Sequence, residues 1–148
     1  MEGPERLSLR RLALQSFGSD DVVVDIDWSG ISTGTERLLW TGRMPSFPGM
    51  GYPLVPGYES VGRVVDAGFN EKARIGELVF VPGASCFKDA RGLFGGAARR
   101  LIVNLRIRHS DFWEKLSHSR QAMLLFRVRR IIRLPEDELS AGCVVAKV

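Results

Sequence analysis

The first hundred or so residues predict a mainly β domain, either a barrel or a sandwich, with short helices. Two observations support this fold class. Short runs rich in β-branched and aromatic residues recur between turn residues, and nearly all of the glycines and six of the seven prolines precede residue 99. Runs of this kind, bounded by Gly, Pro, Asp or Asn, are typical of strands. Many short strands joined by tight turns are typical of barrels and sandwiches.

Three segments carry the strand pattern: residues 22–28, 61–65 and 78–81. In the first, acidic and apolar residues alternate after Val24, so one face of that strand is expected to meet solvent. The segment TERLLW, residues 35–40, predicts a single helical turn with Thr35 as a candidate N-cap. Gly-rich and Asp-rich clusters predict turns at 18–21, 66–70, 81–85 and 91–96.

Size and composition fit one soluble globular domain. The chain has 148 residues, of which 45% are hydrophobic and 26% are charged. No apolar run reaches the roughly 18 residues that a membrane helix needs, and the charged N-terminus does not resemble a secretory signal. The two cysteines stand alone without metal-ligand spacing, so a disulfide framework is not expected and a reducing cytoplasm is the predicted location.

Charge divides the chain near residue 98. Residues 1–98 contain ten Lys and Arg against twelve Asp and Glu, whereas residues 99–133 contain ten against two. We therefore predict one domain over residues 1–104 and an atypical basic tail over residues 105–148. Within the tail, the pattern predicts a helix over about 110–130, followed by a short strand, a proline stop and an acidic helix start within 130–140.

A run in the middle of the domain carries a family resemblance. Residues 29–65, SGISTGTERLLWTGRMPSFPGMGYPLVPGYESVGRVV, resemble the catalytic domain of the medium-chain dehydrogenase/reductase superfamily. The motifs FVPGASCF and GLFGGAARRLIV extend the match over about residues 8–103, and RRIIRLPEDELS is similar to the segment that leads towards a nucleotide-binding domain. Within the superfamily, the run looks like the branch that acts on bacteriochlorophyllides in bacteriochlorophyll synthesis.

The resemblance implies both a fold and a reaction. The fold is a GroES-like, partly open β-barrel. The reaction is NAD-dependent oxidation of the hydroxyethyl group of a bacteriochlorophyllide to an acetyl group. No GxGxxG or Walker motif occurs in the sequence, so the cofactor-binding residues are unknown and a nucleotide-binding domain is expected to be absent. The chain is then a catalytic-domain fragment, expected to be inactive alone. The alternative is a non-enzymatic module that binds tetrapyrroles or acts as a basic interaction protein.

The resemblance also implies that the site holds no metal. Zinc-dependent relatives usually have a cysteine at the position of Ser32 and a histidine at the position of Tyr58. Serine and tyrosine hydroxyls are poor zinc ligands at neutral pH because neither ionises readily. Glu59 keeps its place, but one carboxylate cannot hold zinc by itself. The four-cysteine zinc lobe of many relatives is missing as well.

Oxidation of an alcohol without zinc needs a general base or a proton relay. The candidate catalytic residues are Ser32, Thr35, Tyr58 and Glu59. For each of the last three a structural role is the alternative: Thr35 as an N-cap, Tyr58 as a core side chain with a satisfied hydroxyl, and Glu59 as a carboxylate that holds a turn.

The candidate substrate-binding residues lie in an apolar, proline-rich loop. A flat macrocycle would suit a platform of aromatic and methionine side chains, and packing of the loop itself is the alternative. These residues are Trp40, Met44, Phe47 and Tyr52.

The basic segment 99–133 has three interpretations. Its arginines and aromatic residues could bind phosphates or anionic lipid. A disturbed reading frame, an insertion or a degenerating gene would also change composition abruptly, since the resembled family continues with a short apolar strand at this point. The third interpretation is a specialised insertion. A small bacteriochlorophyllide-type substrate is the predicted partner, and no nucleic acid is predicted.

The ligand replacements at Ser32 and Tyr58 lead to a prediction about zinc. Elemental analysis of the purified protein should find no stoichiometric zinc, and a chelator should leave its melting temperature unchanged. Tightly bound zinc near one equivalent would mean that a site has been missed, in which case Cys86 is the first residue to test.

Overall fold

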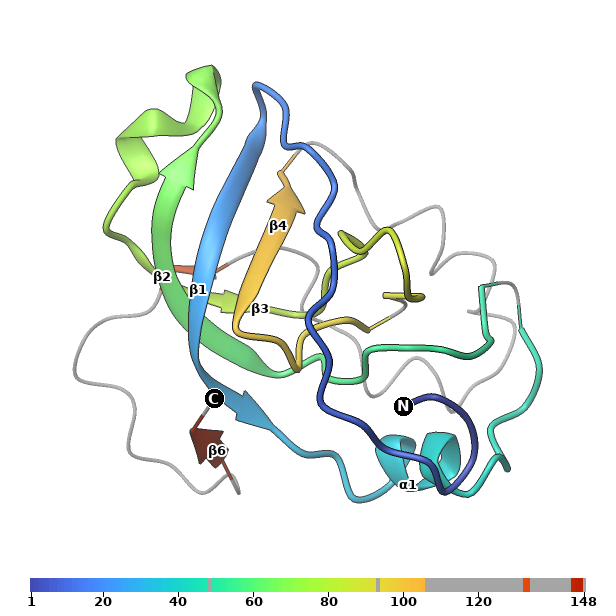
Figure 1. The fold of residues 1–148 in the computed structure, drawn as a ribbon. Coiled ribbons are helices and arrows are strands. Elements are labelled where there is room, and N and C mark those ends of the chain that lie inside the picture. The colour runs from blue at the N-terminus through green and yellow to red at the C-terminus, as the bar shows by residue number, and fades with distance from the viewer. Residues whose placement is uncertain (48, 93, 106–131, 134–144, 148) are drawn as a thin grey trace.

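The computed structural model describes residues 1–47, 49–92, 94–105, 132–133 and 145–147. Within these residues, one antiparallel sheet runs through the domain (Figure 1), in the strand order β4-β1-β2-β3-β5, with β6 also paired to β1. The path does not return to its first strand, so the sheet is open, as the sequence predicts. Its strands are β1 (Asp21–Gly30), β2 (Ser60–Ala67), β3 (Leu78–Val81), β4 (Arg100–Asn104), β5 (Ile132–Arg133) and β6 (Val145–Lys147).

Strand β1 is the centre of this arrangement, because it pairs with three other strands. Its first half is buried, with Val22 and Val24 fully so. The predicted alternation after Val24 holds for Ile26, which is buried, and for Asp27, which is exposed. It is wrong at Trp28, which is 39% exposed. The pairing with β2 shifts register between Ile26 and Trp28. Because of this irregularity, the Trp28 side chain lies on the solvent side of the strand and not on the expected buried side.

Among the described residues, two short helices accompany the sheet. Helix α1 spans Thr35–Trp40, the segment predicted as a helical turn. The prediction that Thr35 is its N-cap is wrong: Gly34 holds that position, and Thr35 is the first helical residue. A 3-10 helix, η1 (Phe69–Arg74), follows β2 where the sequence predicts only a turn.

Strand β4 lies beyond the charge boundary and still belongs to the core. Arg100 is exposed, whereas Leu101 is fully buried and pairs with Val24 of β1. Because exposure alternates along β4, Arg100 lies on its solvent side while Leu101 enters the core. The short strand predicted within 130–140 is confirmed at Ile132–Arg133, which pairs with β3. The helix predicted over 110–130 lies outside the described residues.

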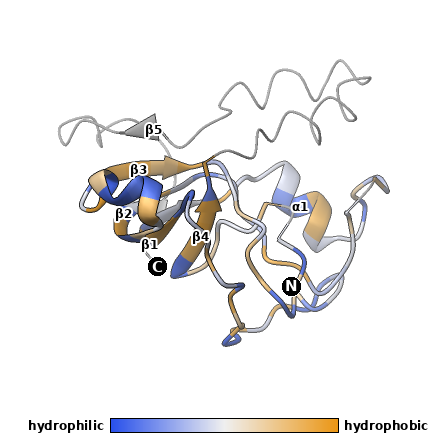
Figure 2. Cartoon of the chain, turned by 90° about the horizontal axis from the view of Figure 1, so that it is seen from above, coloured by the Kyte–Doolittle hydropathy of each residue, from blue (hydrophilic) through white to orange (hydrophobic). Residues whose placement is uncertain are grey.

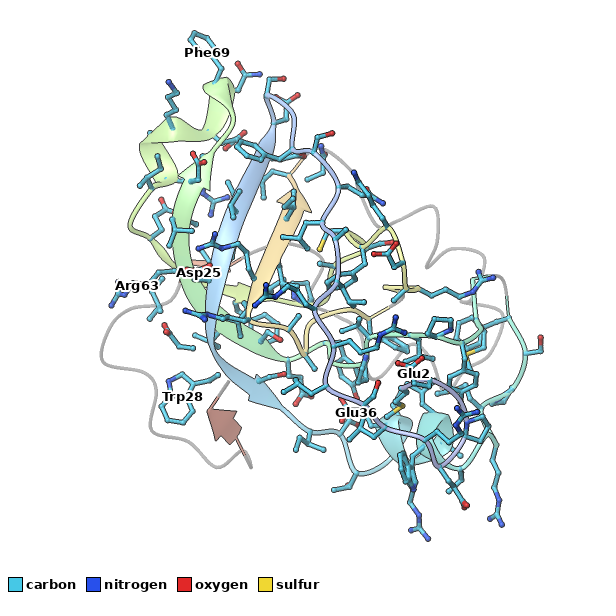
Figure 3. The ribbon with its side chains drawn as sticks, in the orientation of Figure 1. Glu2, Asp25, Trp28, Glu36, Arg63 and Phe69 are labelled. Carbon is cyan, nitrogen blue, oxygen red and sulfur yellow. The ribbon has the colours of Figure 1, made fainter. Side chains whose placement is uncertain are left out.

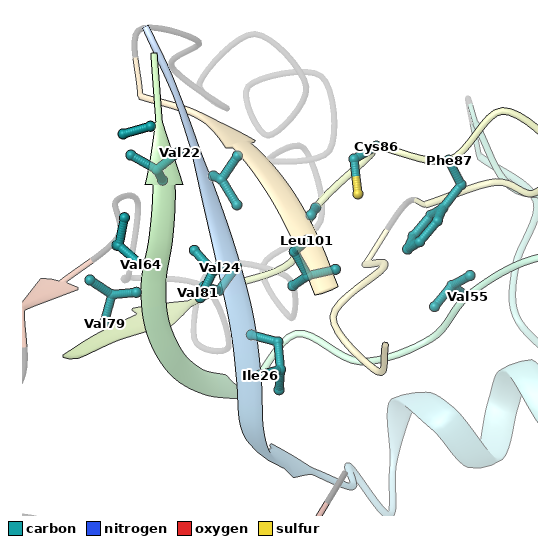
Figure 4. Close-up of a cluster of buried hydrophobic side chains, with 13 residues drawn as sticks. Val22, Val24, Ile26, Val55, Val64, Val79, Val81, Cys86, Phe87 and Leu101 are labelled. Atoms are coloured by element: carbon teal, nitrogen blue, oxygen red, sulfur yellow. The ribbon is translucent and has the colours of Figure 1, made fainter. Parts of the chain in front are cut away.

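The apolar side chains form two clusters. The main core gathers around strands β1 to β4, together with Val55, Cys86 and Phe87 (Figure 4). Figure 2 shows the same strands coloured mainly as hydrophobic. A second cluster lies near α1 and consists of Leu39, Leu54, Tyr58 and Phe94. Among the described residues, no helix is long and apolar enough to cross a membrane.

The position of Leu101 allows a direct test of the β1–β4 core. Leu101→Ala should lower the free energy of unfolding by about 2–5 kcal/mol, because truncation of a buried leucine removes apolar contacts and leaves a cavity. Urea denaturation is the measurement. Val65→Ala on β2, where the side chain is 43% exposed, is the control and should change little. A loss below about 1 kcal/mol for Leu101→Ala would contradict the placement of β4 in the core.

Candidate active site

A cleft of about 1240 Å³ lies beside α1. Its wall comes from the N-terminal segment, the turn between β1 and α1, the loop before β2 and the approach to β4. Most of the lining side chains are apolar, and they include Leu7, Leu9, Leu12, Leu14, Ile31, Leu54, Val55 and Phe87. Of the candidate residues, Ser32 and Trp40 reach the lining, and so does Glu36.

The end of β1 and the start of β2 are held close together at this cleft. The Gly30 N–H donates to the Glu59 carbonyl at 2.6 Å. A Cβ on Gly30 would lie 2.5 Å from Oε2 of Glu59 and 2.9 Å from its Cβ, so no other residue fits without a shift. This approach brings the turn that carries Ser32 beside the turn that carries Tyr58 and Glu59.

The Pro-Gly-Tyr-Glu turn is shaped by Gly57. Its φ of +93° is a conformation that L side chains rarely adopt, and an added Cβ would lie 2.6 Å from the Ala97 N. The Gly57 carbonyl accepts a hydrogen bond from the Gly96 N–H at 2.8 Å. Ser60 Oγ donates to the Gly96 carbonyl, also at 2.8 Å. Residues 57–60 are thus anchored to the segment before β4, which fixes the position of Tyr58.

Three of the predicted catalytic residues are linked by hydrogen bonds. Ser32 Oγ accepts the Thr35 N–H at 3.3 Å, and the Tyr58 hydroxyl donates to Thr35 Oγ1 at 3.4 Å. Tyr58 is 7% exposed, and its ring lies 5.4 Å from that of Phe94. The structure therefore brings Ser32, Thr35 and Tyr58 together, with Ser32 the member that lines the cleft.

Glu36 is a further carboxylate in this group. It is half-buried on the first turn of α1, its backbone N–H donates to the Ser32 carbonyl at 3.1 Å, and it lines the cleft. Figure 3 shows it beside α1. Burial raises the pKa of Glu36 to about 7, and the nearby charge of Glu59 contributes in the same direction. The resemblance implies only that Thr35 and Glu36 lie where relatives carry relay and loop-anchoring groups, whereas the electrostatic effect of Glu59 on Glu36 arises only when the two turns meet.

The predicted substrate-binding residues separate into two groups. Trp40 lines the cleft. Met44 and Tyr52 pack against the second apolar cluster, and the Tyr52 hydroxyl donates to the Leu39 carbonyl. Phe47 is half-buried and lies outside the cleft lining formed by the described residues. Packing of the loop is therefore observed for Met44 and Tyr52.

The chain was compared with known families and structures. Residues 18–106 match the family model described as the alcohol dehydrogenase GroES-like domain. The chain belongs to this family. The match confirms the predicted GroES-like fold, with the open sheet described above.

Two curated relatives are close in sequence. The 2-desacetyl-2-hydroxyethyl bacteriochlorophyllide A dehydrogenase of Rhodobacter capsulatus is 58% identical over 104 residues, which cover 70% of this chain and 33% of the relative. The protein of the same name from Cereibacter sphaeroides is 54% identical over 108 residues, covering 70% of this chain and 34% of the relative. The chain thus spans about one third of the length of these relatives.

A solved structure shows the same fold. A Sinorhizobium meliloti protein assigned to the zinc-binding dehydrogenases, bound to NADP, is 28% identical with a TM-score of 0.52. The alignment covers 70% of this chain and 34% of the other.

The residues of this chain do not fit a zinc ion at the equivalent position. Ser32 and Tyr58 offer neutral hydroxyls, and both are engaged with Thr35. Within the described residues, no three His, Cys, Asp or Glu side chains are gathered into a potential metal site. No step of the chemistry is therefore assigned to zinc.

The raised pKa of Glu36 has a consequence for stability. Between about pH 4.5 and 7 the folded state holds a proton on Glu36 that the unfolded state has lost, so this group lowers stability as pH rises through that window. Glu36→Gln should remove the loss and raise the melting temperature above that of the unmodified protein at pH 8, but not at pH 4. Because Glu36 is half-buried, the gain should be only a few degrees.

Thermal melts from pH 4 to 8 provide the measurement. Asp27→Asn, at an exposed position on β1, is the control and should not change the pH dependence. A constant difference between Glu36→Gln and the unmodified protein across the whole range would contradict the raised pKa.

Proposed function

We propose that the chain is the catalytic domain of an NAD-dependent dehydrogenase that oxidises the hydroxyethyl group of a bacteriochlorophyllide to an acetyl group. The observation that carries this proposal is that Ser32 and Glu36 both line one large apolar cleft, with the Glu36 backbone N–H donating to the Ser32 carbonyl. The name and 58% identity of the Rhodobacter relative supply the substrate class.

The cleft is large enough for such a substrate. Its volume of about 1240 Å³ exceeds the roughly 300–1,000 Å³ that is usual for small-molecule sites, so it leaves room for a second ligand beside the pigment. A nicotinamide cofactor, when bound, accepts the hydride from the carbinol carbon.

The chain's own residues handle the proton. We assign to Ser32 a hydrogen bond with the substrate hydroxyl, because its Oγ lines the cleft. Glu36 lines the same wall and accepts the proton that the alcohol loses as its carbonyl forms. A carboxylate with a pKa of about 7 suits this role, since it is partly ionised at neutral pH and still binds a proton well.

The other candidates position these two groups. Tyr58 donates to Thr35 Oγ1, and the Thr35 N–H donates to Ser32 Oγ, so the pair orients the serine hydroxyl. Glu59 acts through its charge on Glu36.

Trp40 is assigned to contact one face of the macrocycle, since it lines the cleft. Met44 and Tyr52 support the loop through the second cluster, and no contact with the pigment is assigned to Phe47.

NAD is the proposed cofactor, and the cytoplasm is the proposed location. The Sinorhizobium structure contains NADP, whereas NAD is proposed here from the resemblance to the bacteriochlorophyllide branch. A buried thiol such as Cys86 suits a reducing cytoplasm, which is the proposed location.

A chimeric enzyme tests the proposed function. Residues 1–104 of this chain would replace the matching part of the Rhodobacter dehydrogenase, which the 58% identity makes practicable. The chimera should reduce NAD with the hydroxyethyl bacteriochlorophyllide and form the acetyl product. Glu36→Gln in the chimera should lower kcat by about 10²–10⁴-fold, the usual contribution of a general base, and leave KM for the pigment nearly unchanged.

The outcomes separate the domain assignment from the role of Glu36. Asp27→Asn in the chimera is the matched control and should keep full activity. A folded chimera that binds NAD but does not oxidise the pigment would contradict the proposed function. An active chimera in which Glu36→Gln keeps its kcat would contradict only the assignment of the base.

A further inference from the structure

Five arginines line the cleft, and two of them are already paired. Arg10 donates to the Glu2 carboxylate at 3.1 and 3.2 Å. Arg100 donates to Asp25 at 2.5 and 2.8 Å and so engages both carboxylate oxygens. The other three make no ion pair with a carboxylate in the part of the chain that the structure describes; they are Arg11, Arg37 and Arg99.

These three arginines come from different parts of the cleft. Arg37 follows Glu36 on α1, at the end assigned to the reaction. The Arg99 carbonyl accepts the Ile26 N–H at 2.8 Å. Ile26 lies four residues before Gly30 on β1. At about 3.3 Å per residue, the distance from Ile26 to Gly30 along the strand is roughly 13 Å. Figure 3 shows Asp25, the neighbour of Ile26, well removed from Glu36.

Arg11 lies on the N-terminal segment, which is fixed to the barrel. The Lys88 N–H donates to the Ala13 carbonyl at 2.9 Å, and Leu14 forms a bridge with Phe87. The segment therefore holds Arg11 at the cleft through backbone contacts. Asp25 accepts hydrogen bonds from Arg100 on both of its oxygens, and Arg99 acts on the same carboxylate through its charge.

Part of the cleft wall is apolar and exposed. Leu7, Leu9 and Ile31 line the cleft and are 68%, 103% and 53% exposed. Exposed apolar surface beside unpaired guanidinium groups fits a ligand with a broad apolar body and one anionic substituent.

We propose that Arg11 and Arg99 bind the free propionate carboxylate of the pigment, so that the cleft selects the free acid over its esters. This inference rests on the proposed function. A bacteriochlorophyllide carries that carboxylate on a different pyrrole ring from the hydroxyethyl group, so one substituent can reach Arg99 while the other lies at Ser32. Guanidinium groups bind carboxylates through strong, charge-assisted hydrogen bonds, which an uncharged ester cannot match.

A titration of the purified 148-residue chain tests the anchor. The probes are the hydroxyethyl bacteriochlorophyllide and its methyl ester, and binding is followed by the change in pigment absorbance. The free acid should bind at least about tenfold more tightly than the ester, a difference that one charge-assisted contact can supply. In the double variant Arg11→Gln, Arg99→Gln this preference should vanish, while the affinity for the ester stays the same.

A third arginine variant is the control for loss of charge. Arg43→Gln removes an equal charge at an exposed position outside the cleft lining and should keep the preference. Circular dichroism of the double variant should match that of the unmodified chain, because both replaced side chains are exposed. Equal affinity of the unmodified chain for acid and ester, or an undiminished preference in the double variant, would overturn the anchor alone. Binding of neither pigment would overturn the proposed substrate and the anchor with it.

Discussion

The close approach of Gly30 to Glu59 is the contact on which the candidate site depends. The two residues lie at the end of β1 and immediately before β2, and one 2.6 Å hydrogen bond joins their backbones. Any side chain at position 30 would meet the Glu59 carboxylate. Because the strands converge here, the Ser32 turn and the Tyr58 turn share one small volume, and the charge of Glu59 reaches Glu36. The chemistry of the cleft is thus a consequence of how one strand pair ends.

This arrangement offers a physical substitute for a metal in alcohol oxidation. A bound zinc ion would lower the pKa of the substrate hydroxyl directly. In the proposed mechanism the hydroxyls of Ser32 and Tyr58 stand where the resemblance places zinc ligands, and proton affinity is supplied by electrostatics instead. Partial burial and a neighbouring carboxylate both disfavour the ionised form of Glu36, which brings its pKa to about 7. The proposed base thus arises from burial of Glu36 and from the nearby Glu59 carboxylate, at a modest cost in stability above neutral pH.

The parts of the structure that local sequence determines could be predicted, and the parts that depend on distant contacts could not. Strand 78–81 and helix 35–40 have the predicted bounds, since their apolar and turn residues are adjacent in sequence. At β4 the change in charge near residue 98 does not coincide with an end of the core: exposed Arg99 and Arg100 precede the buried Leu101, inside the predicted domain of residues 1–104. The resemblance directs attention to the turns that carry Ser32 and Tyr58, but the raised pKa of Glu36 comes from its burial and from the charge of Glu59, which the chain brings near only by folding.

Strand β1 also sets the separation between the two ends of the cleft. Near one end it carries Asp25, which engages Arg100 beside Arg99, and at the other it leads through Gly30 to Ser32. A backbone in a paired strand holds a nearly fixed length, so the distance from the proposed base to the proposed anchor does not depend on flexible side chains. A rigid macrocycle can exploit this: once its carboxylate is fixed at one end, its shape alone determines which substituent reaches the other end. Selection of the reacting group then follows from the register of the sheet, with little need for direct contacts to that group.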